Sequence, residues 1–555
     1  MADKDQQILE LQQELERTRA QSNVQFDAYQ TVLTRRYCSA AMSTLFGQRS
    51  RIGIWRKLWL ALAESERALG IDTITLDALE EMRSHLYVTD SDFEIARIEE
   101  KKRRHDVMAH VHAFGIVAPA AAGIIHYGAT SCFVTDNAEL IIMRDALDIL
   151  LNRLAKVIWN LSSFAMKWKE EPTLAYTHLQ PAQLPLNGYK ISWYSIAASL
   201  ESRISDQNRL TTLQFDLKAI EQVRSDLKFR GAQVRIVSPF KPRGTSRFLS
   251  SAIPFEMFVL VILISIDSLV MSNRASFLGK DILSGTSQVR TEDRYSLLTY
   301  SRNDISTQTY TRKVDLVIAN AVAGLGATAQ KICGDIRHLA NWKEIEEPFE
   351  QNQIGSSAMA YKRNPMRSER VYSLARELMS KPANFANTLS DQWAERTLDD
   401  SAIRRMDIPD MFLLAEAILL GLDNITDGLV VYPKRIQSRV QEELPFMITE
   451  SIIMKLVAKG ASRQEAHEEI RVLSHQAGAV VKNEGKPNDL VSRIKSTEFF
   501  KPIWGELDGM LDPKLYTGRS VDIVEKYCGV GGPVELKLVP YIKYITETST
   551  AELSV

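Results

Sequence analysis

The sequence predicts a protein built from long helices, and three stretches carry this prediction. Apolar side chains recur at the helical spacing i, i+3, i+4 and i+7 over residues 55–62. Residues 140–166 are apolar almost without a break, as expected for a helix buried between other helices. Ser462 and Glu465 form a capping-box pattern that opens a helix running towards Gly485.

Length and composition exclude several classes of protein. A chain of 555 residues is too long for one compact core, so we expect about two to four units. The hydrophobic content of 45%, the charged content of 25% and the net charge of -1 exclude a disordered chain and a general polyanion binder, so nucleic acid is not an expected partner. The four cysteines lack Cys-x-x-Cys spacing, which indicates a reducing compartment and argues against zinc. No apolar signal segment opens the chain, so the cytoplasm is the expected location.

The first part of the chain leads into the helix over 55–62. Residues 1–24 are polar with a thin apolar stripe, and we expect a solvated extension without a catalytic role. Arg36 and Tyr37 stand shortly before the helix, and Gly70 marks its end. An arginine–tyrosine pair in this place is open to a structural role as well as to ligand binding.

Three histidines follow the basic end of the next helical stretch. His105 and His112 lie two turns apart on one helical face, while His110 points elsewhere. The spacing is not His-Glu-x-x-His and no further ligand cluster is present, so a metal site is not expected. We interpret His110 and His112 as packing residues.

A turn of small residues leads into the long apolar helix. Thr130 and Ser131 offer hydroxyl and amide donors at a helix start, which is a favourable place for a carboxylate. Asp136 and Asn137 are expected to cap the helix that follows.

After the long helix, a polar turn holds His178 between Thr177 and Pro181. On the residues alone, a hydrogen-bonded loop residue is a sufficient interpretation of His178.

Residues 350–370 begin as a small polar loop, in which Gly355 relaxes the backbone and Pro365 restrains Asn364 to an extended conformation. The loop combines a potential base, a point charge, an amide and two guanidiniums, namely Ser356 or Ser357, Lys362, Asn364, Arg367 and Arg370. Such a set suits an anionic substrate. The alternative interpretation is a solvated basic turn.

The complete string from 350 to 370 favours the functional interpretation because of a resemblance. It closely resembles the signature loop of the fumarase/aspartase superfamily, Gly-Ser-Ser-x-Met-Pro-x-Lys-x-Asn-Pro before a long helix. Its continuation over 361–370 resembles specifically the adenylosuccinate lyases. The Arg-His-Asp at 104–106 and the Thr-His-x-Gln-Pro-Ala-Gln at 177–183 are similar to motifs of the same family. Ala360 stands where the family has proline, which we expect to loosen the loop modestly.

The resemblance covers nearly the whole chain except 1–24 and 234–306. It implies an all-α, three-domain fumarase/aspartase-like fold, in which a long central helical bundle assembles a homotetramer and each active site is built from three subunits. The implied division is an N-terminal extension (1–24), an N-terminal helical domain (25–130), a central helical-bundle domain (131–430) and a C-terminal helical domain (431–555).

The resemblance also implies roles for individual residues. Ser356 is the implied general base, and His178 is the implied general acid, since an unperturbed imidazole can deliver a proton near neutral pH. Lys362, Asn364 and the Thr130–Ser131 turn are implied to stabilise the anionic intermediate. The implied substrate-binding set is Arg36, Tyr37, Arg104, His105, Asp106, Thr130, Ser131, Thr177, Lys362, Asn364, Arg370, Arg396, Ser401 and Arg405.

The implied reaction is β-elimination of fumarate from adenylosuccinate, giving AMP, and from the succinyl-carboxamide imidazole ribotide in purine biosynthesis. Both nucleotides carry a 5′-phosphate, which gives the set of arginines a use. No metal or organic cofactor is required. The alternatives are another fumarate-releasing lyase such as argininosuccinate lyase, whose substrate has no phosphate, and a catalytically impaired family member.

Residues 234–306 depart from the family pattern, and the Gly-Thr loop that the family has there is absent. The apolar run 257–266 is too short to span a bilayer, so a membrane is not an expected partner. The sequence departs abruptly from the family pattern at this point and matches it again afterwards. We therefore hypothesise that 234–274 derives from a mistranslated or alternatively spliced stretch of the gene. A transcript that carries the stretch in every copy would contradict that hypothesis.

Overall fold

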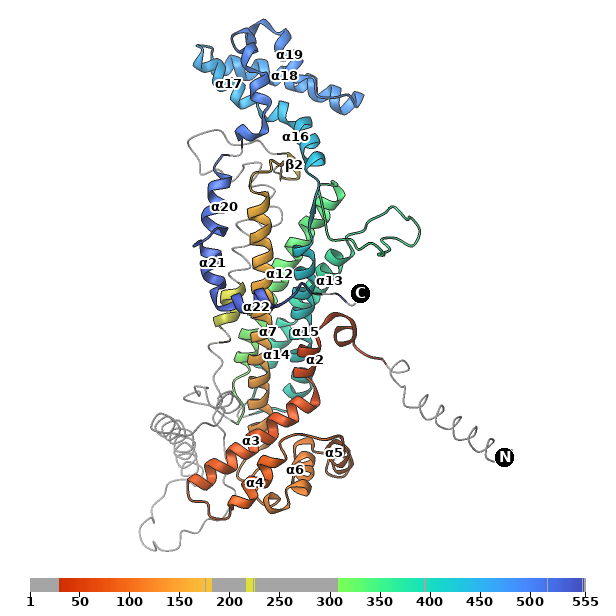
Figure 1. Cartoon of the computed structure of the whole chain (residues 1–555), viewed down its shortest axis with the longest axis vertical. Coiled ribbons are helices and arrows are strands. Elements are labelled where there is room, and N and C mark those ends of the chain that lie inside the picture. The colour runs from red at the N-terminus through yellow and green to blue at the C-terminus, as the bar shows by residue number, and fades with distance from the viewer. Residues whose placement is uncertain are drawn as a thin grey trace, which may run out of the picture.

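The computed structural model describes residues 29–174, 176–181, 216–222, 224, 308–393, 396–516, 518–551 and 553. Within these residues the chain is mostly helical, which confirms the predicted class. A long helical bundle forms the axis of the molecule, and smaller groups of helices lie at its two ends (Figure 1). The predicted extension 1–24 and the atypical region 234–306 lie outside the described residues.

Four helices form the described part of the central bundle: α7 (Ser131–Trp168), α12 (Lys313–Asn341), α13 (Met366–Ser380) and α15 (Asp400–Asp427). They pack on one another and share one large apolar core. The apolar stretch 140–166 lies within α7, as predicted. The short helix α14 (Pro382–Ser390) connects α13 to the segment before α15 and packs on both α12 and α15.

Helix α12 is long and apolar enough, by length and composition, to cross a membrane. Its apolar side chains belong to the interior of the bundle, since Ile332 and Ile336 are fully buried. The helix packs on α13, α14 and α15. It therefore has the character of the core helix of a bundle.

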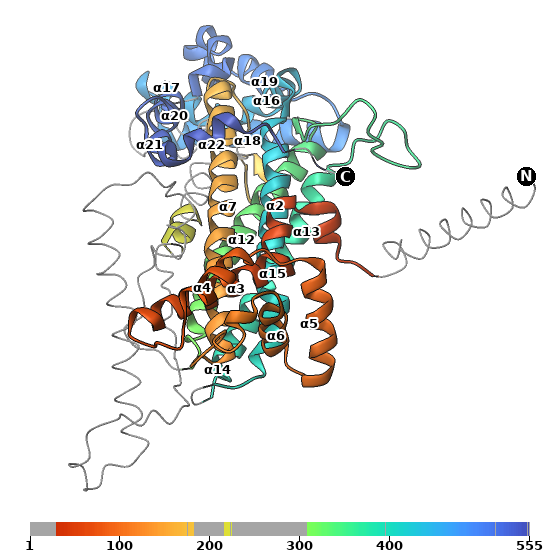
Figure 2. The ribbon, with the colours of Figure 1, turned by 60° about the horizontal axis from the view of Figure 1, so that its bottom comes forward.

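The elements from α3 to η2 form one end of the molecule, around Trp59 and Phe114, which stack with their ring centroids 6.2 Å apart. Figure 2 shows this end brought forward, with α3 to α6 grouped beside the start of α7. Gly70 adopts a left-handed φ of 92° just after α3, as expected for a helix end. The elements of this end are α3 (Gln48–Ala68), α4 (Leu76–Ser84), α5 (Asp90–Arg103), α6 (Asp106–Val117) and η2 (Pro119–Ala121). The preceding η1 (Leu33–Tyr37) and α2 (Ala40–Leu45) pack on α15 of the bundle instead.

The elements after α15 form the other end and then return to the bundle. Helix α18 begins after Ser462, whose hydroxyl accepts a hydrogen bond from the Glu465 amide (3.4 Å), and it ends at Gly485 with a left-handed φ of 63°. The last helices, α20 to α22, run back along α7 (Figure 1). The elements are α16 (Pro433–Met447), α17 (Thr449–Ala458), α18 (Arg463–Glu484), α19 (Leu490–Ser496), η3 (Glu498–Glu506), η4 (Asp508–Leu511), η5 (Pro513–Tyr516), α20 (Ser520–Cys528), α21 (Pro533–Leu538), η6 (Val539–Tyr541) and α22 (Ile542–Glu547).

Two antiparallel strand pairs join segments near the C-terminal end of the bundle. Strands β1 (Tyr176–Thr177) and β2 (Gln180–Pro181) form a hairpin. Strand β3 (Ile345–Glu346) pairs with β4 (Val430–Val431) and so ties the end of α12 to the end of α15.

Two expectations about local structure are wrong. Asp136 and Asn137 do not cap the long helix, because it already begins at Ser131 and both side chains are buried inside it. His105 does not share a helical face with His112, because the helix is interrupted between α5 and α6 at Arg104, which has a left-handed φ of 56°.

The two histidines interpreted as packing residues differ in their surroundings. His110 lies between Trp55 and Phe93, with ring centroids 5.8 Å from each, so that prediction is confirmed. His112 is exposed, so its prediction is wrong.

Candidate active site

The loop between β3 and α13, residues 347–365, is closed by contacts within itself. The Asn364 side-chain amide donates to the Gly355 carbonyl oxygen (2.7 Å). A Cβ atom on Gly355 would lie 2.1 Å from the carbonyl oxygen of Lys362, so the loop can close only on a glycine. Figure 1 shows the loop projecting from the side of the bundle before α13.

Within the loop, Ser356 receives hydrogen bonds at its hydroxyl oxygen from the backbone. The amides of Met359 (3.2 Å) and Ala358 (3.4 Å) both donate to Ser356 Oγ. Donors that converge on one oxygen favour its negatively charged form. Of the two serines that the sequence left open, Ser356 is therefore the better placed to act as a base.

Glu347 fixes the point where the loop joins α13. Its buried carboxylate accepts from the amides of Arg367 (2.9 Å) and Ser368 (2.8 Å) and from the Ser368 hydroxyl (2.7 Å). These bonds satisfy free amides at the helix N-terminus. Lys362, by contrast, is exposed. The loop is therefore held firmly where it joins α13, while its tip is accessible to solvent.

A cavity of about 440 Å³ lies beside the start of α13, and we call it the arginine cavity. Its polar lining includes Arg36, Tyr37, Arg153, Arg367 and Arg370, together with residues 548–551. The predicted residues Arg36, Tyr37 and Arg370 thus come together, and the Arg370 guanidinium lies 5.2 Å from the centre of the Tyr37 ring.

The segment that carries Arg36 and Tyr37 is held on α15 by Glu416. The Ser39 hydroxyl donates to Glu416 Oε1 (2.6 Å), and the Ser39 amide donates to Oε2 (3.0 Å). Cys38 Sγ donates to the Leu413 carbonyl oxygen (3.0 Å), and burial raises the pKa of this thiol far above its ordinary value. Cys38 is therefore an inert packing residue beside the cavity.

Two further arginines line this cavity: Arg153 was not expected from the sequence, and Arg367 was expected as part of the loop but not of the substrate-binding set. Arg153 lies on α7, and its Nε is 3.8 Å from Glu416 Oε1. Helix α7 also carries Arg144 and Lys156, so no sequence signal distinguished Arg153 from its charged neighbours. Arg367 donates to the Asn424 side-chain oxygen (2.7 Å) and pairs with Glu350.

A second group of predicted residues lies where α6 and α15 begin. Arg405 Nη2 donates to Asp106 Oδ2 (2.5 Å), and its Nε donates to the Ser401 hydroxyl (3.4 Å). Burial raises the pKa of Asp106, but the bond from Arg405 and its charge outweigh burial and hold that pKa below its ordinary value. His105 caps α6 directly after Arg104, and both are exposed.

The turn that carries Thr130 and Ser131 is held by a half-buried histidine. Trp59 Nε1 donates to His126 Nδ1 (2.9 Å), and His126 adopts a left-handed φ of 67°. Burial, and to a smaller extent the charge of His105, lowers the pKa of His126 to about 4. The ring is therefore neutral at neutral pH and can accept this bond, which fixes the approach to α7.

Beneath the start of α15 lies a buried ion network that the sequence analysis missed. Arg312 pairs with Asp400 (2.6 Å) and Asp136 (3.3 Å), while Arg404 pairs with Asp315 (2.8 Å). Burial lowers the pKa of Arg404, but the carboxylate of Asp315 and its neighbours raise it well above its ordinary value. The network joins α7, α12 and α15 and fixes the turn from which Ser401 and Arg405 project.

His178 lies at the tip of the β1–β2 hairpin, and its side chain is exposed. His178 and Leu179 have left-handed φ angles of 54° and 57°, as in the tightest hairpin turns. The hairpin is fixed at its base, where the Tyr176 ring stacks on Trp342 at 4.5 Å. The side chain of Thr177 lies outside the described residues.

The predicted residues therefore fall into separate places within one chain. Among the described residues, no hydrogen bond or ion pair joins His178, Ser356 and Asp106 to one another. Arg396 lies in the segment before α15, and its Nε is buried without a hydrogen-bond partner among the described residues. The described ranges also contain no group of three or more His, Cys, Asp or Glu side chains able to hold a metal ion.

Comparison with known proteins gives one consistent family. The chain is 47% identical to the adenylosuccinate lyase of Saccharomyces cerevisiae over 528 residues, which covers 94% of this chain and 98% of the yeast protein. It is 45% identical to that of Schizosaccharomyces pombe, with the same coverage, and 41% identical to that of Schistosoma mansoni, covering 91% of this chain and 95% of that protein. Residues 445–527 match the family described as adenylosuccinate lyase C-terminus.

Solved structures agree on the fold. A fumarate lyase from Mesorhizobium sp. BNC1 superposes with a TM-score of 0.66 at 18% identity, covering 91% of this chain and 100% of that one. The 3-carboxy-cis,cis-muconate lactonizing enzyme from Pseudomonas putida superposes with a TM-score of 0.67 at 19% identity, covering 93% and 100%.

Proposed function

The chain belongs to the adenylosuccinate lyase family, and from this membership we propose how its residues divide the reaction, with Ser356 as general base and His178 as general acid. The enzyme is a carbon–nitrogen lyase of purine biosynthesis. It eliminates fumarate from adenylosuccinate and leaves AMP. The observation that carries this function is the 47% identity to a relative that the chain covers almost completely.

The arginine cavity supports a nucleotide substrate. Arg36, Arg153 and Arg370 come together there from three different elements, and guanidinium groups are the side chains best suited to a phosphate. Adenylosuccinate and the succinyl-carboxamide imidazole ribotide both carry a 5′-phosphate. We propose that both are substrates and that their phosphate occupies this cavity.

Removal of the proton next to a carboxylate requires a base and a means of stabilising a dianion. A serine hydroxyl is a poor base in water, so Ser356 must be ionised within a closed, water-poor pocket. The backbone donors at Ser356 Oγ favour the ionised form, and Lys362 and Asn364 add positive charge and a donor. The pocket forms when the loop 347–365 closes over the substrate.

Protonation of the departing nitrogen is the second step. His178 stands on a fixed hairpin with an exposed ring, and histidine is the side chain most often used for proton transfer in catalysis. The ring is thus free to face a substrate that is bound by other elements.

The separation of the predicted residues within one chain supports a shared active site. Four chains would assemble through the long helices of the central bundle, and three of them would contribute to each site. We also propose the division into an N-terminal domain (25–130), a central domain (131–430) and a C-terminal domain (431–555), and a cytoplasmic location.

The substrate assignment is tested by turnover of the purified chain, followed by ultraviolet absorbance. We expect adenylosuccinate to be consumed and argininosuccinate to be left intact, because argininosuccinate has no phosphate for the arginine cavity. Ser356→Ala is expected to abolish turnover, while Ser357→Ala is the matched control at the neighbouring hydroxyl. A folded tetramer without turnover would instead identify a catalytically impaired family member.

A further inference from the structure

The arginine cavity has a wall that comes from the opposite end of the sequence. Residues 548–551 follow α22 and line the cavity together with Arg36 and Arg370. This segment contains Thr548, Ser549 and Thr550 in succession and carries none of the motifs described above.

Buried side chains of α15 hold the segment in place. The Ala551 amide donates to Asp423 Oδ2 (2.9 Å), and the Asn424 side-chain amide donates to the Ala551 carbonyl oxygen (3.0 Å). Asp423 is itself fixed, because Asn160 of α7 donates to its Oδ1 (2.9 Å). Both polar groups of Ala551 are therefore bound to the bundle.

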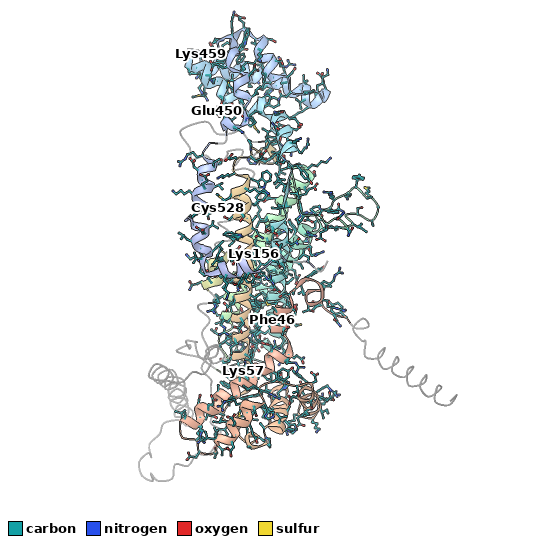
Figure 3. All side chains as sticks on the ribbon, in the orientation of Figure 1. Phe46, Lys57, Lys156, Glu450, Lys459 and Cys528 are labelled. Carbon is teal, nitrogen blue, oxygen red and sulfur yellow. The ribbon has the colours of Figure 1, made fainter. Side chains whose placement is uncertain are left out.

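A lysine of α7 holds the start of the same segment. Lys156, labelled in Figure 3, donates to the carbonyl oxygens of Ile545 (3.2 Å) and Thr548 (3.4 Å). The segment is thus fixed at both ends, and Ser549 stands between the two anchors.

Asn424 connects this wall with the cavity and with the loop. Its side-chain oxygen accepts from Arg367 Nη1 (2.7 Å), while its amide group holds Ala551. Arg367 also pairs with Glu350 at the start of the loop 347–365. The Asn424 side chain therefore holds Arg367 and residues 548–551 at fixed positions relative to each other.

The hydroxyl groups of Ser549 and Thr550 differ in their hydrogen bonding. The Thr550 hydroxyl donates to Asp427, whereas the Ser549 hydroxyl makes no hydrogen bond to another described residue. Ser549 is exposed and is one of the residues that line the cavity. A hydroxyl group among guanidiniums is a common companion in phosphate binding.

We propose that residues 548–551 form part of the phosphate-binding site and that Ser549 donates its hydroxyl hydrogen to the substrate phosphate. This inference rests on the proposed function, because it assigns the phosphate to the arginine cavity.

The test places a negative charge in the wall. Ser549→Asp is expected to raise KM for adenylosuccinate about tenfold with kcat within about twofold, because the carboxylate repels the phosphate but is remote from the bond that breaks. Inhibition by inorganic phosphate should weaken by the same factor. Ser549→Asn, of similar size and without charge, should raise KM by no more than about threefold.

Thr546→Asp is the matched control, since it adds the same charge on the exposed side of α22, outside the cavity lining. Its KM should equal that of the parent chain. If Ser549→Asp and Thr546→Asp have the same KM in an active enzyme, the inference is wrong while the proposed function stands. Absence of turnover in the parent chain would overturn the proposed function itself.

Discussion

Gly355→Ala tests the closed geometry of the loop that carries Ser356. The added Cβ would meet the Lys362 carbonyl oxygen at 2.1 Å, whereas real Cβ contacts are essentially never shorter than 3.0 Å, so the loop must open by about 1 Å. The change also displaces the Gly355 carbonyl oxygen that accepts from Asn364. A displacement of this size in a catalytic loop is expected to reduce kcat by about a hundredfold.

The loop is mostly exposed, so the same substitution should change the free energy of unfolding by less than about 1 kcal/mol. The assay is steady-state turnover of adenylosuccinate combined with a urea melt. Gly478→Ala in α18 is the matched control, because an added Cβ there meets nothing within 4 Å. It should leave kcat unchanged and stabilise the helix by up to about 1 kcal/mol. An unchanged kcat in Gly355→Ala would refute the assignment of this loop to catalysis.

Three further substitutions test the scaffold. Arg312→Met should lower the free energy of unfolding by about 3–5 kcal/mol in urea melts, because Asp400 stays buried without its cation and Asp136 keeps only Arg404, at 3.7 Å. A loss below about 1 kcal/mol would contradict this. Phe412→Ala should cost about 3–5 kcal/mol by calorimetry, since the ring is fully buried, and a neutral result would show that the core repacks. Burial raises the pKa of Glu66 from 4.5 to about 8, so the folded state holds a proton that the unfolded state releases, and stability falls as pH rises through this interval. Glu66→Gln should therefore raise the melting temperature relative to the parent chain at pH 8 but not at pH 5, and equal differences at both would contradict the assignment.

Long helices with a regular apolar pattern could be predicted from the sequence. The stretches at 55–62, 140–166 and after Ser462 are helical because their apolar spacing and end signals agree with one another. Half of the predicted capping box is present at Ser462, whose hydroxyl accepts a hydrogen bond from the Glu465 amide.

Helix ends and turns that depend on a left-handed backbone conformation at a non-glycine residue could not be predicted. Arg104 and His126 have left-handed φ angles without being glycines, and tertiary contacts such as the bond from Trp59 to His126 hold the second of them. The expected helix through His105 failed for this reason.

Sites formed by residues that are far apart in the sequence could not be predicted either. The partners of Arg312 are 88 and 176 positions away, and no spacing rule links them. Arg153 belongs to the same class, because only the fold brings α7 beside η1 and α13 in the arginine cavity. Arg36, Tyr37 and Arg370 were identified because a family motif named them, and the cavity gives a physical reason for the grouping.

His178 and Ser356 are proposed to act together in one active site, each supplied by a different chain. Ser356→Ala and His178→Ala should each be inactive alone. If the two variants are denatured together and reassembled as mixed tetramers, sites that receive an intact serine and an intact histidine from different subunits should restore roughly a quarter of the parent activity. No activity in mixed tetramers of confirmed composition would contradict a shared site built on these two residues.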